Sequence, residues 1–187
     1  MTDLTQADIY AAFMLDHATG ALASELQLAG DLHVRLHPAG SGTSDLWAIV
    51  GGVLLEDVAP AEGGTRRTVT HAGCDTQVLA DSLIGGSQRL NWRRGLFGFD
   101  TAHLSPRLGR LLRMAPGKSV IEHGHNRLEA AVILEGALDD GHATYEAGEI
   151  LFSWPGMRHK PRAVGEECCI CYVGREQERK KQWFSRH

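Results

Sequence analysis

The chain has 187 residues, of which 43% are hydrophobic and 22% are charged. This length and composition fit one ordinary globular domain or two small ones, and they exclude a collagen-like, disordered or disulfide-rich scaffold. The net charge of −4 argues against a generally cationic DNA-binding or membrane-binding protein. Residues 1–58 carry eight acidic residues and one arginine, a net −7, and residues 59–187 carry +3. This asymmetry indicates two modules with different partners.

Residues 1–58 are predicted to form a small helical domain. A first helix runs from Thr5 to Gly20, with an acidic residue in its first turn. A second runs from Leu22 to His37, and the segment Pro38 to Gly42 is expected to break it. A third starts near Ser44 and ends before the next proline. Three short helices with apolar stripes predict a bundle that has little core of its own.

The remaining chain is predicted to consist of a linker and a β domain. Residues 59–89 are rich in Gly, Thr and charge, and we expect a linker there with one short helix from Asp75 to Leu83. From residue 90 onward, β-prone runs alternate with Gly and Pro at residues 108–114, 130–134, 149–154 and 169–173. This spacing predicts an all-β sandwich or barrel over residues 90–187, and hence an α+β multidomain fold.

Targeting signals and cysteines indicate a cytoplasmic location. No secretory signal opens the sequence, and its longest apolar run, Trp47 to Leu55, is too short to span a bilayer. Three of the four cysteines lie within four residues of one another, which suits no set of structural cross-links; the four are Cys74, Cys168, Cys169 and Cys171. We therefore expect reduced thiols and no membrane contact.

Three histidines and a glutamate have the spacing of metal ligands. In a strand, His123 and His125 point to the same face, and the next strand could return Glu129 to that face. His159 is a fourth candidate. Three imidazoles and one carboxylate suit a divalent transition metal such as Zn, Fe, Mn or Ni. The alternative is that these histidines are ordinary surface loop residues.

The same spacing resembles the cupin superfamily, a family of small jelly-roll β-barrels. The first cupin motif, G-x5-H-x-H-x3-E-x6-G, is matched by Gly117, His123, His125, Glu129 and Gly136. The second, G-x5-P-x-G-x2-H, is matched by Gly148, Gly156 and His159, with Trp154 in place of the proline. The resemblance implies one divalent metal per cupin domain, with zinc expected first and Fe, Mn or Ni as alternatives.

Further segments are similar to the ChrR family of anti-sigma factors. They are Leu90 to Arg94 before the barrel, Leu111 to Gly117 at its entry, and Cys169-Ile170-Cys171 on a late strand. The resemblance implies that residues 1–58 bind an alternative sigma factor of the extracytoplasmic-function type, with no direct contact to nucleic acid. It also implies that the cupin domain responds to an oxidative or small-molecule signal. Cupins commonly dimerise, so a homodimer through the cupin is a further possibility.

The sequence departs from the ChrR pattern in the amino-terminal domain. That family usually holds zinc there through H-x3-C-x2-C on the second helix and an earlier histidine. Here His33 matches the histidine, whereas His37 and Gly40 stand at the cysteine positions. With His17 the domain offers at most three ligands, and structural zinc requires four. We therefore expect no zinc in this domain.

Two questions of chemistry stay open at this point. Cys169 and Cys171 are candidate redox residues, although alternating thiols on a strand pair poorly and packing is the favoured alternative. The protein could instead be a metal-dependent cupin enzyme of the dioxygenase or isomerase type. Glu122 is expected to point away from His123, which weakens it as a base, and Arg127 and Tyr145 are possible pocket residues. We assign no catalytic residue and expect a regulator. A third possibility is that the helices serve only as an oligomerisation scaffold.

Overall fold

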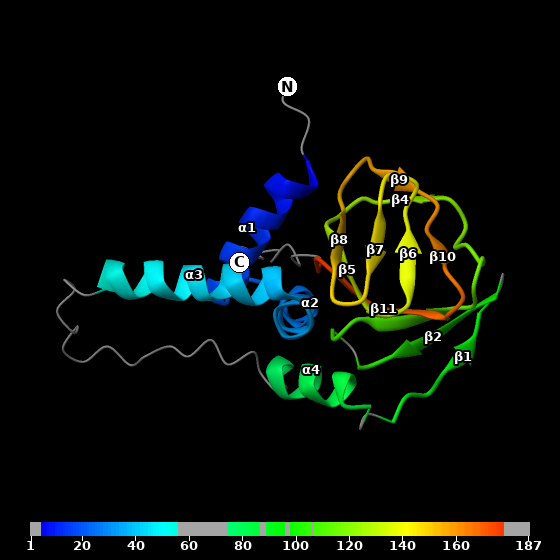
Figure 1. Cartoon of the computed structure of the whole chain (residues 1–187), viewed down its shortest axis with the longest axis horizontal. Coiled ribbons are helices and arrows are strands. Elements are labelled where there is room, and N and C mark those ends of the chain that lie inside the picture. Colours follow the sequence, from blue (N-terminus) through cyan, green and yellow to red (C-terminus); the bar gives the residue numbers. More distant parts are fainter. Residues whose placement is uncertain (1–4, 56–74, 87–88, 96–97, 106, 178–187) are drawn as a thin grey trace, which may run out of the picture.

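The computed structural model describes residues 5–55, 75–86, 89–95, 98–105 and 107–177. Helices gather on one side and strands form a barrel on the other (Figure 1), which confirms the expected α+β arrangement with a carboxy-terminal β domain. Most of the expected linker lies outside the described residues. Among the described helices, none combines the length and apolar character that crossing a membrane requires.

The first two helices form as predicted. Helix α1 (Gln6–Thr19) starts at a capping box, in which Thr5 accepts a hydrogen bond from the Asp8 amide and the Asp8 carboxylate accepts one from the Thr5 amide. It ends at Gly20, whose φ of 69° is the left-handed conformation that glycine adopts without strain. Helix α2 (Ser24–Leu36) follows within a few residues.

The third helix starts earlier than predicted. The second helix does end before Pro38, as predicted, with His37 in an extended conformation. Helix α3 (Pro38–Leu55) nevertheless includes the segment Pro38 to Gly42, so the predicted start near Ser44 is wrong. A proline in the first turn removes no helical hydrogen bond, because its amide would be unpaired there in any case. Gly40 has a packing role, since a Cβ at this position would lie 2.7 Å from the carbonyl oxygen of His33. The residues that look like helix breakers therefore let α2 and α3 approach closely.

The short helix predicted from Asp75 to Leu83 is present as α4 (Thr76–Ile84). Asp75 caps it by accepting hydrogen bonds from two amides of the first turn. The helix packs against α2, and Arg35 of α2 forms an ion pair with Asp81 of α4 at 2.5 Å. In space, α4 is thus a fourth member of the helical part.

Three antiparallel sheets make up the barrel. The largest has the order β1-β2-β3-β11-β5-β8, formed by β1 (Arg93–Arg94), β2 (Phe99–His103), β3 (Arg110–Met114), β5 (Glu129–Glu135), β8 (Ile150–Ser153) and β11 (Cys169–Arg175). A second sheet has the order β10-β6-β7, formed by β6 (Ala137–Asp139), β7 (Thr144–Glu146) and β10 (Arg162–Val164). The third pairs β4 (His123–Gly124) with β9 (Arg158–His159). The four predicted β runs correspond to β3, β5, β8 and β11.

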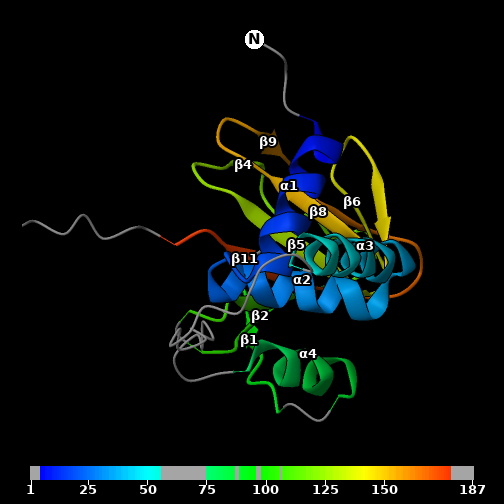
Figure 2. The same cartoon turned by 90° about the vertical axis from the view of Figure 1, so that its left-hand side faces the viewer.

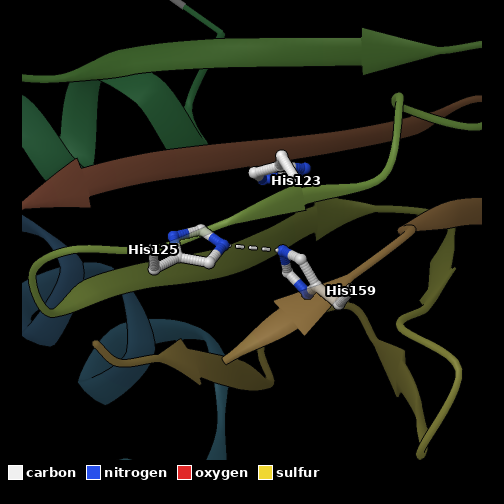
Figure 3. Close-up of side chains that lie close together, drawn as sticks. All are labelled: His123, His125 and His159. Carbon is white, nitrogen blue, oxygen red and sulfur yellow. Dashed lines mark hydrogen bonds between the residues drawn. The ribbon is translucent and has the colours of Figure 1, made fainter. Parts of the chain in front are cut away.

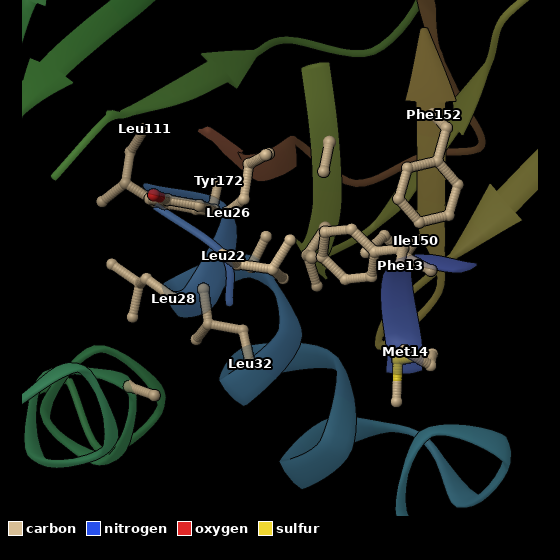
Figure 4. Close-up of a cluster of buried hydrophobic side chains, with 14 of the residues drawn as sticks. Phe13, Met14, Leu22, Leu26, Leu28, Leu32, Leu111, Ile150, Phe152 and Tyr172 are labelled. Atoms are coloured by element: carbon tan, nitrogen blue, oxygen red, sulfur yellow. The ribbon is translucent and has the colours of Figure 1, made fainter. Parts of the chain in front are cut away.

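Strands β5, β8 and β11 of the six-stranded sheet are largely buried. The outer face of the sheet packs on the helices (Figure 4), where Phe13, Leu26 and Leu32 meet Val132, Phe152 and Tyr172. Its inner face fills the barrel with a second core that includes Ile133, Leu138, Leu151, Cys171 and Val173. Successive residues of a strand point to opposite faces, so β5 and β11 serve both cores at once. The helices therefore share a core with the sheet and do not form a separate bundle.

Polar contacts reinforce this packing of helices on the barrel (Figure 2). The Gln6 side chain donates to the carbonyl oxygen of Phe152 at 2.8 Å and accepts from its amide at 3.1 Å. The Tyr172 hydroxyl donates to the carbonyl oxygen of Glu25 at 2.8 Å. His33 Nδ1 donates to the carbonyl oxygen of Gly148 at 2.8 Å. Helices α1 and α2 are thus fixed to the barrel by hydrogen bonds as well as by apolar contacts.

Candidate metal centre

The pairing of β4 with β9 brings the two cupin motifs together. His123 and His159 are register partners in this pair, and the His125 amide donates to the carbonyl oxygen of Met157 at 3.1 Å. The turns near this strand pair need positive φ angles, which glycine adopts without strain. The four motif glycines there have φ between 70° and 91°: Gly117, Gly136, Gly148 and Gly156. The glycine spacing and the histidine spacing thus serve one local structure.

Three imidazoles converge at this point (Figure 3). One ring nitrogen from each of His123, His125 and His159 lies within 4.8 Å of the others. His125 Nε2 and His159 Nε2 are 2.9 Å apart. A tetrahedral metal with bonds of about 2.0–2.1 Å places its nitrogen ligands roughly 3.4 Å apart, so small side-chain shifts would accommodate it. Within the described residues this is the one group of three or more His, Cys, Asp or Glu close enough to hold a metal.

The protonation of these histidines also suits a metal. Burial, together with the charges of His123 and His125, lowers the pKa of His159 to about 4, and burial lowers the pKa of His125. Neutral imidazole is the form that binds metals. His123 Nδ1 lies 2.9 Å from the carbonyl oxygen of Ile121, so it donates there and leaves Nε2 as the acceptor. The donor set therefore fits a divalent transition metal.

Glu129 lies beside the histidines but outside their cluster. Its Oε1 is 3.9 Å from His125 Nδ1, and its Oε2 forms an ion pair with Arg175 Nε. With His123 and His159 it lines a cavity of about 50 Å³ in the barrel interior. Sequence reasoning missed Arg175, because it lies 46 residues from Glu129 and no motif marks it.

The cysteines of β11 belong to the barrel core. Cys169 and Cys171 are buried, and Cys171 also lines the cavity that contains the histidines. A hydrogen bond with Cys169 and burial raise the pKa of the Cys171 thiol well above its ordinary value. The reactive form of cysteine is the thiolate, so this environment favours packing. A redox role for the pair stays a prediction, and Cys74 lies outside the described residues.

The histidines of the helical part take part in packing. His33 is buried, with Nδ1 on the Gly148 carbonyl and Nε2 at 3.1 Å from the Tyr10 hydroxyl. His37 stacks on His33 with ring centroids 5.5 Å apart. His17 Nε2 pairs with the buried Asp31 carboxylate at 3.0 Å. These histidines therefore have structural partners of their own.

The residues considered for catalysis lie outside the cavity. Glu122 is exposed and pairs with Arg158 at 3.1 Å. Burial raises the pKa of Tyr145 to about 12, and neither it nor Arg127 lines the cavity. Among the described residues that line the cavity, Glu129 is the one carboxylate.

Comparison with known proteins shows similarity to ChrR anti-sigma factors. The ChrR cupin-like domain family matches residues 87–178. The chain is 28% identical over 182 residues to the anti-sigma-E factor ChrR of Cereibacter sphaeroides, which covers 86% of this chain and 84% of that protein. The crystal structure of Rhodobacter sphaeroides SigE in complex with the anti-sigma ChrR matches with a TM-score of 0.71 and 26% identity, covering 89% of this chain and 96% of the matched chain. The similarity therefore includes the helices as well as the barrel.

Proposed function

This chain belongs to the ChrR family through its cupin-like domain, and on that premise we propose that it is an anti-sigma factor. Its helical part binds an alternative sigma factor of the extracytoplasmic-function type in the cytoplasm. Its metal-binding cupin domain modulates that binding in response to an oxidative or small-molecule signal. The main support is the likeness of nearly the whole chain to a structure solved as a sigma factor–ChrR complex.

An exposed apolar stripe on α3 is the surface we assign to the sigma factor. It consists of Leu46, Ile49, Val50 and Val53, whose spacing places them on one face of the helix. Ile49 is 64% exposed and Val53 is 62% exposed. In Figure 1, α3 extends away from the barrel. A contiguous apolar patch of this kind is typical of a protein interaction site.

The net charge of residues 1–58 fits the same partner. Residues 1–58 have a net charge of −7. A sigma factor binds DNA and therefore carries basic surfaces, which an acidic domain attracts.

For the cupin domain we propose one divalent metal, with zinc as the expected ion. His123, His125 and His159 would hold it, with Glu129 as the fourth ligand. A bound metal would cross-link the two cupin motifs, and its loss would free them. The likeness to an anti-sigma factor favours a regulatory metal over a dioxygenase or isomerase centre.

The test of the proposed surface is a pair of matched substitutions on α3. Ile49→Asp places a charge in the apolar stripe, whereas Ala48→Asp places the same charge on an exposed position of the opposite face. Full burial of an isoleucine is worth about 1.5–3 kcal/mol, so Ile49→Asp should weaken sigma binding by about tenfold to a hundredfold. Ala48→Asp should bind as the wild type does, measured by calorimetry. Equal affinity of both variants and the wild type would refute the assigned surface.

A further inference from the structure

Arg175, at the end of β11, touches both the candidate metal centre and the helical part. Its side-chain Nε pairs with Glu129 Oε2. Its backbone amide donates to Glu25 Oε2 at 2.9 Å, and Glu25 lies in the first turn of α2. One residue thus lies between a cavity-lining carboxylate and a helix of the proposed sigma-binding part.

On the barrel side, Arg175 sets the orientation of Glu129. The Glu129 side chain is only 10% exposed, and a buried carboxylate is costly unless a cation or hydrogen-bond donors compensate it. The guanidinium occupies Oε2 and leaves Oε1 facing His125 Nδ1 at 3.9 Å. Partners that hold a ligand in this way typically account for a factor of about 10–100 in metal affinity.

On the helix side, the end of β11 is locked to the first turn of α2. A Cβ at Gly174 would lie 2.4 Å from the carbonyl oxygen of Glu25, so strand and helix are in direct backbone contact. The Tyr172 hydroxyl donates to the same carbonyl oxygen at 2.8 Å. A shift of the Arg175 backbone would therefore also shift Glu25, because the strand and the helix are in direct contact.

We propose that Arg175 is a positioning residue: it holds Glu129 for the metal and couples metal occupancy to the first turn of α2. The inference rests on the metal site proposed above and assigns the route by which that site acts on the helices. The route runs from the histidine cluster through Glu129 and Arg175 to Glu25. Each link after the histidines is a hydrogen bond or an ion pair in the structure.

Metal affinity tests the first half of the route. Arg175→Met removes the guanidinium but keeps the backbone amide that bonds Glu25. We expect a 10–100-fold loss of Zn²⁺ affinity in a chelator competition, and a changed Co²⁺ absorption spectrum. The control is Arg158→Met, which removes the exposed ion pair with Glu122 and should leave affinity unchanged. Thermal unfolding of the metal-free proteins verifies that both variants fold, and wild-type Zn²⁺ affinity in a folded Arg175→Met protein would overturn the proposal.

Hydrogen exchange tests the second half of the route, from Arg175 to the first turn of α2. Adding Zn²⁺ to the wild-type chain should slow exchange at the first hydrogen-bonded amides of α2, from Gln27 to Gly30, and Arg175→Met should lose that response. An unchanged response in Arg175→Met, or none in the wild type, would refute the coupling. Neither measurement involves a sigma factor. Failure here with intact sigma binding would therefore leave the proposed function standing, whereas failure of sigma binding would not alter these results.

Discussion

Gly148 offers a direct test of how the cupin domain and α2 fit together. It is a motif glycine with φ of 88°, and a Cβ there would lie 2.7 Å from the carbonyl oxygen of Leu36 at the end of α2. Gly156 has nearly the same φ, 91°, but a Cβ there meets nothing within 4 Å. Gly156→Ala should therefore cost only backbone strain, about 1–3 kcal/mol. Gly148→Ala carries the same strain and must also push α2 off the barrel.

We expect this displacement of α2 to lower the free energy of unfolding of Gly148→Ala by a further amount of about 1–3 kcal/mol, the range found for overpacking in a well-packed interior. The displaced helix would also weaken the hydrogen bond from His33 to the Gly148 carbonyl. Urea denaturation of the wild type and both variants gives the two losses in the free energy of unfolding. Equal losses for Gly148→Ala and Gly156→Ala would show that α2 does not rest on the barrel as described.

Two further predictions concern histidines. Burial lowers the pKa of His33 below its ordinary value. As the pH falls below about 6.5, His33 therefore becomes protonated in the unfolded chain while it stays neutral in the folded chain. The free energy of unfolding should therefore fall as the pH drops below 6.5, and His33→Gln should flatten this slope; an equal slope in both proteins would contradict it. His159→Ala should abolish stoichiometric zinc, measured by metal analysis after gel filtration, whereas His142→Ala, at an exposed loop position, should retain it. Full zinc content in His159→Ala would contradict the proposed site.

Local patterns in the sequence predicted the parts of the structure that local rules control. The capping residues at Thr5 and Gly20 set the limits of α1, and β-prone runs between Gly and Pro marked β3, β5, β8 and β11. The histidine and glycine spacing brought His123, His125 and His159 to one place, because motif turns determine where these side chains go. Such signals depend on neighbours within a few residues.

Features that depend on distant contacts could not be predicted in this way. Pro38 and Gly40 have the composition of a helix break, yet both lie in the first turn of α3, where Gly40 approaches His33 closely. The apolar residues of α1 and α2 indicated helices without showing that their partner is the sheet. The ion pair of Glu129 with Arg175 joins residues far apart in sequence, so the orientation of the Glu129 side chain could not be predicted from local patterns.

In the proposed function, the metal-binding cupin and the helices form one regulator of a sigma factor. Affinity purification of the chain from its native cell, under reducing conditions, tests this most directly when bound proteins and bound metal are both identified. We expect to recover an alternative sigma factor together with one divalent metal per chain. Recovery of the metal without a sigma factor or other transcription protein would contradict it.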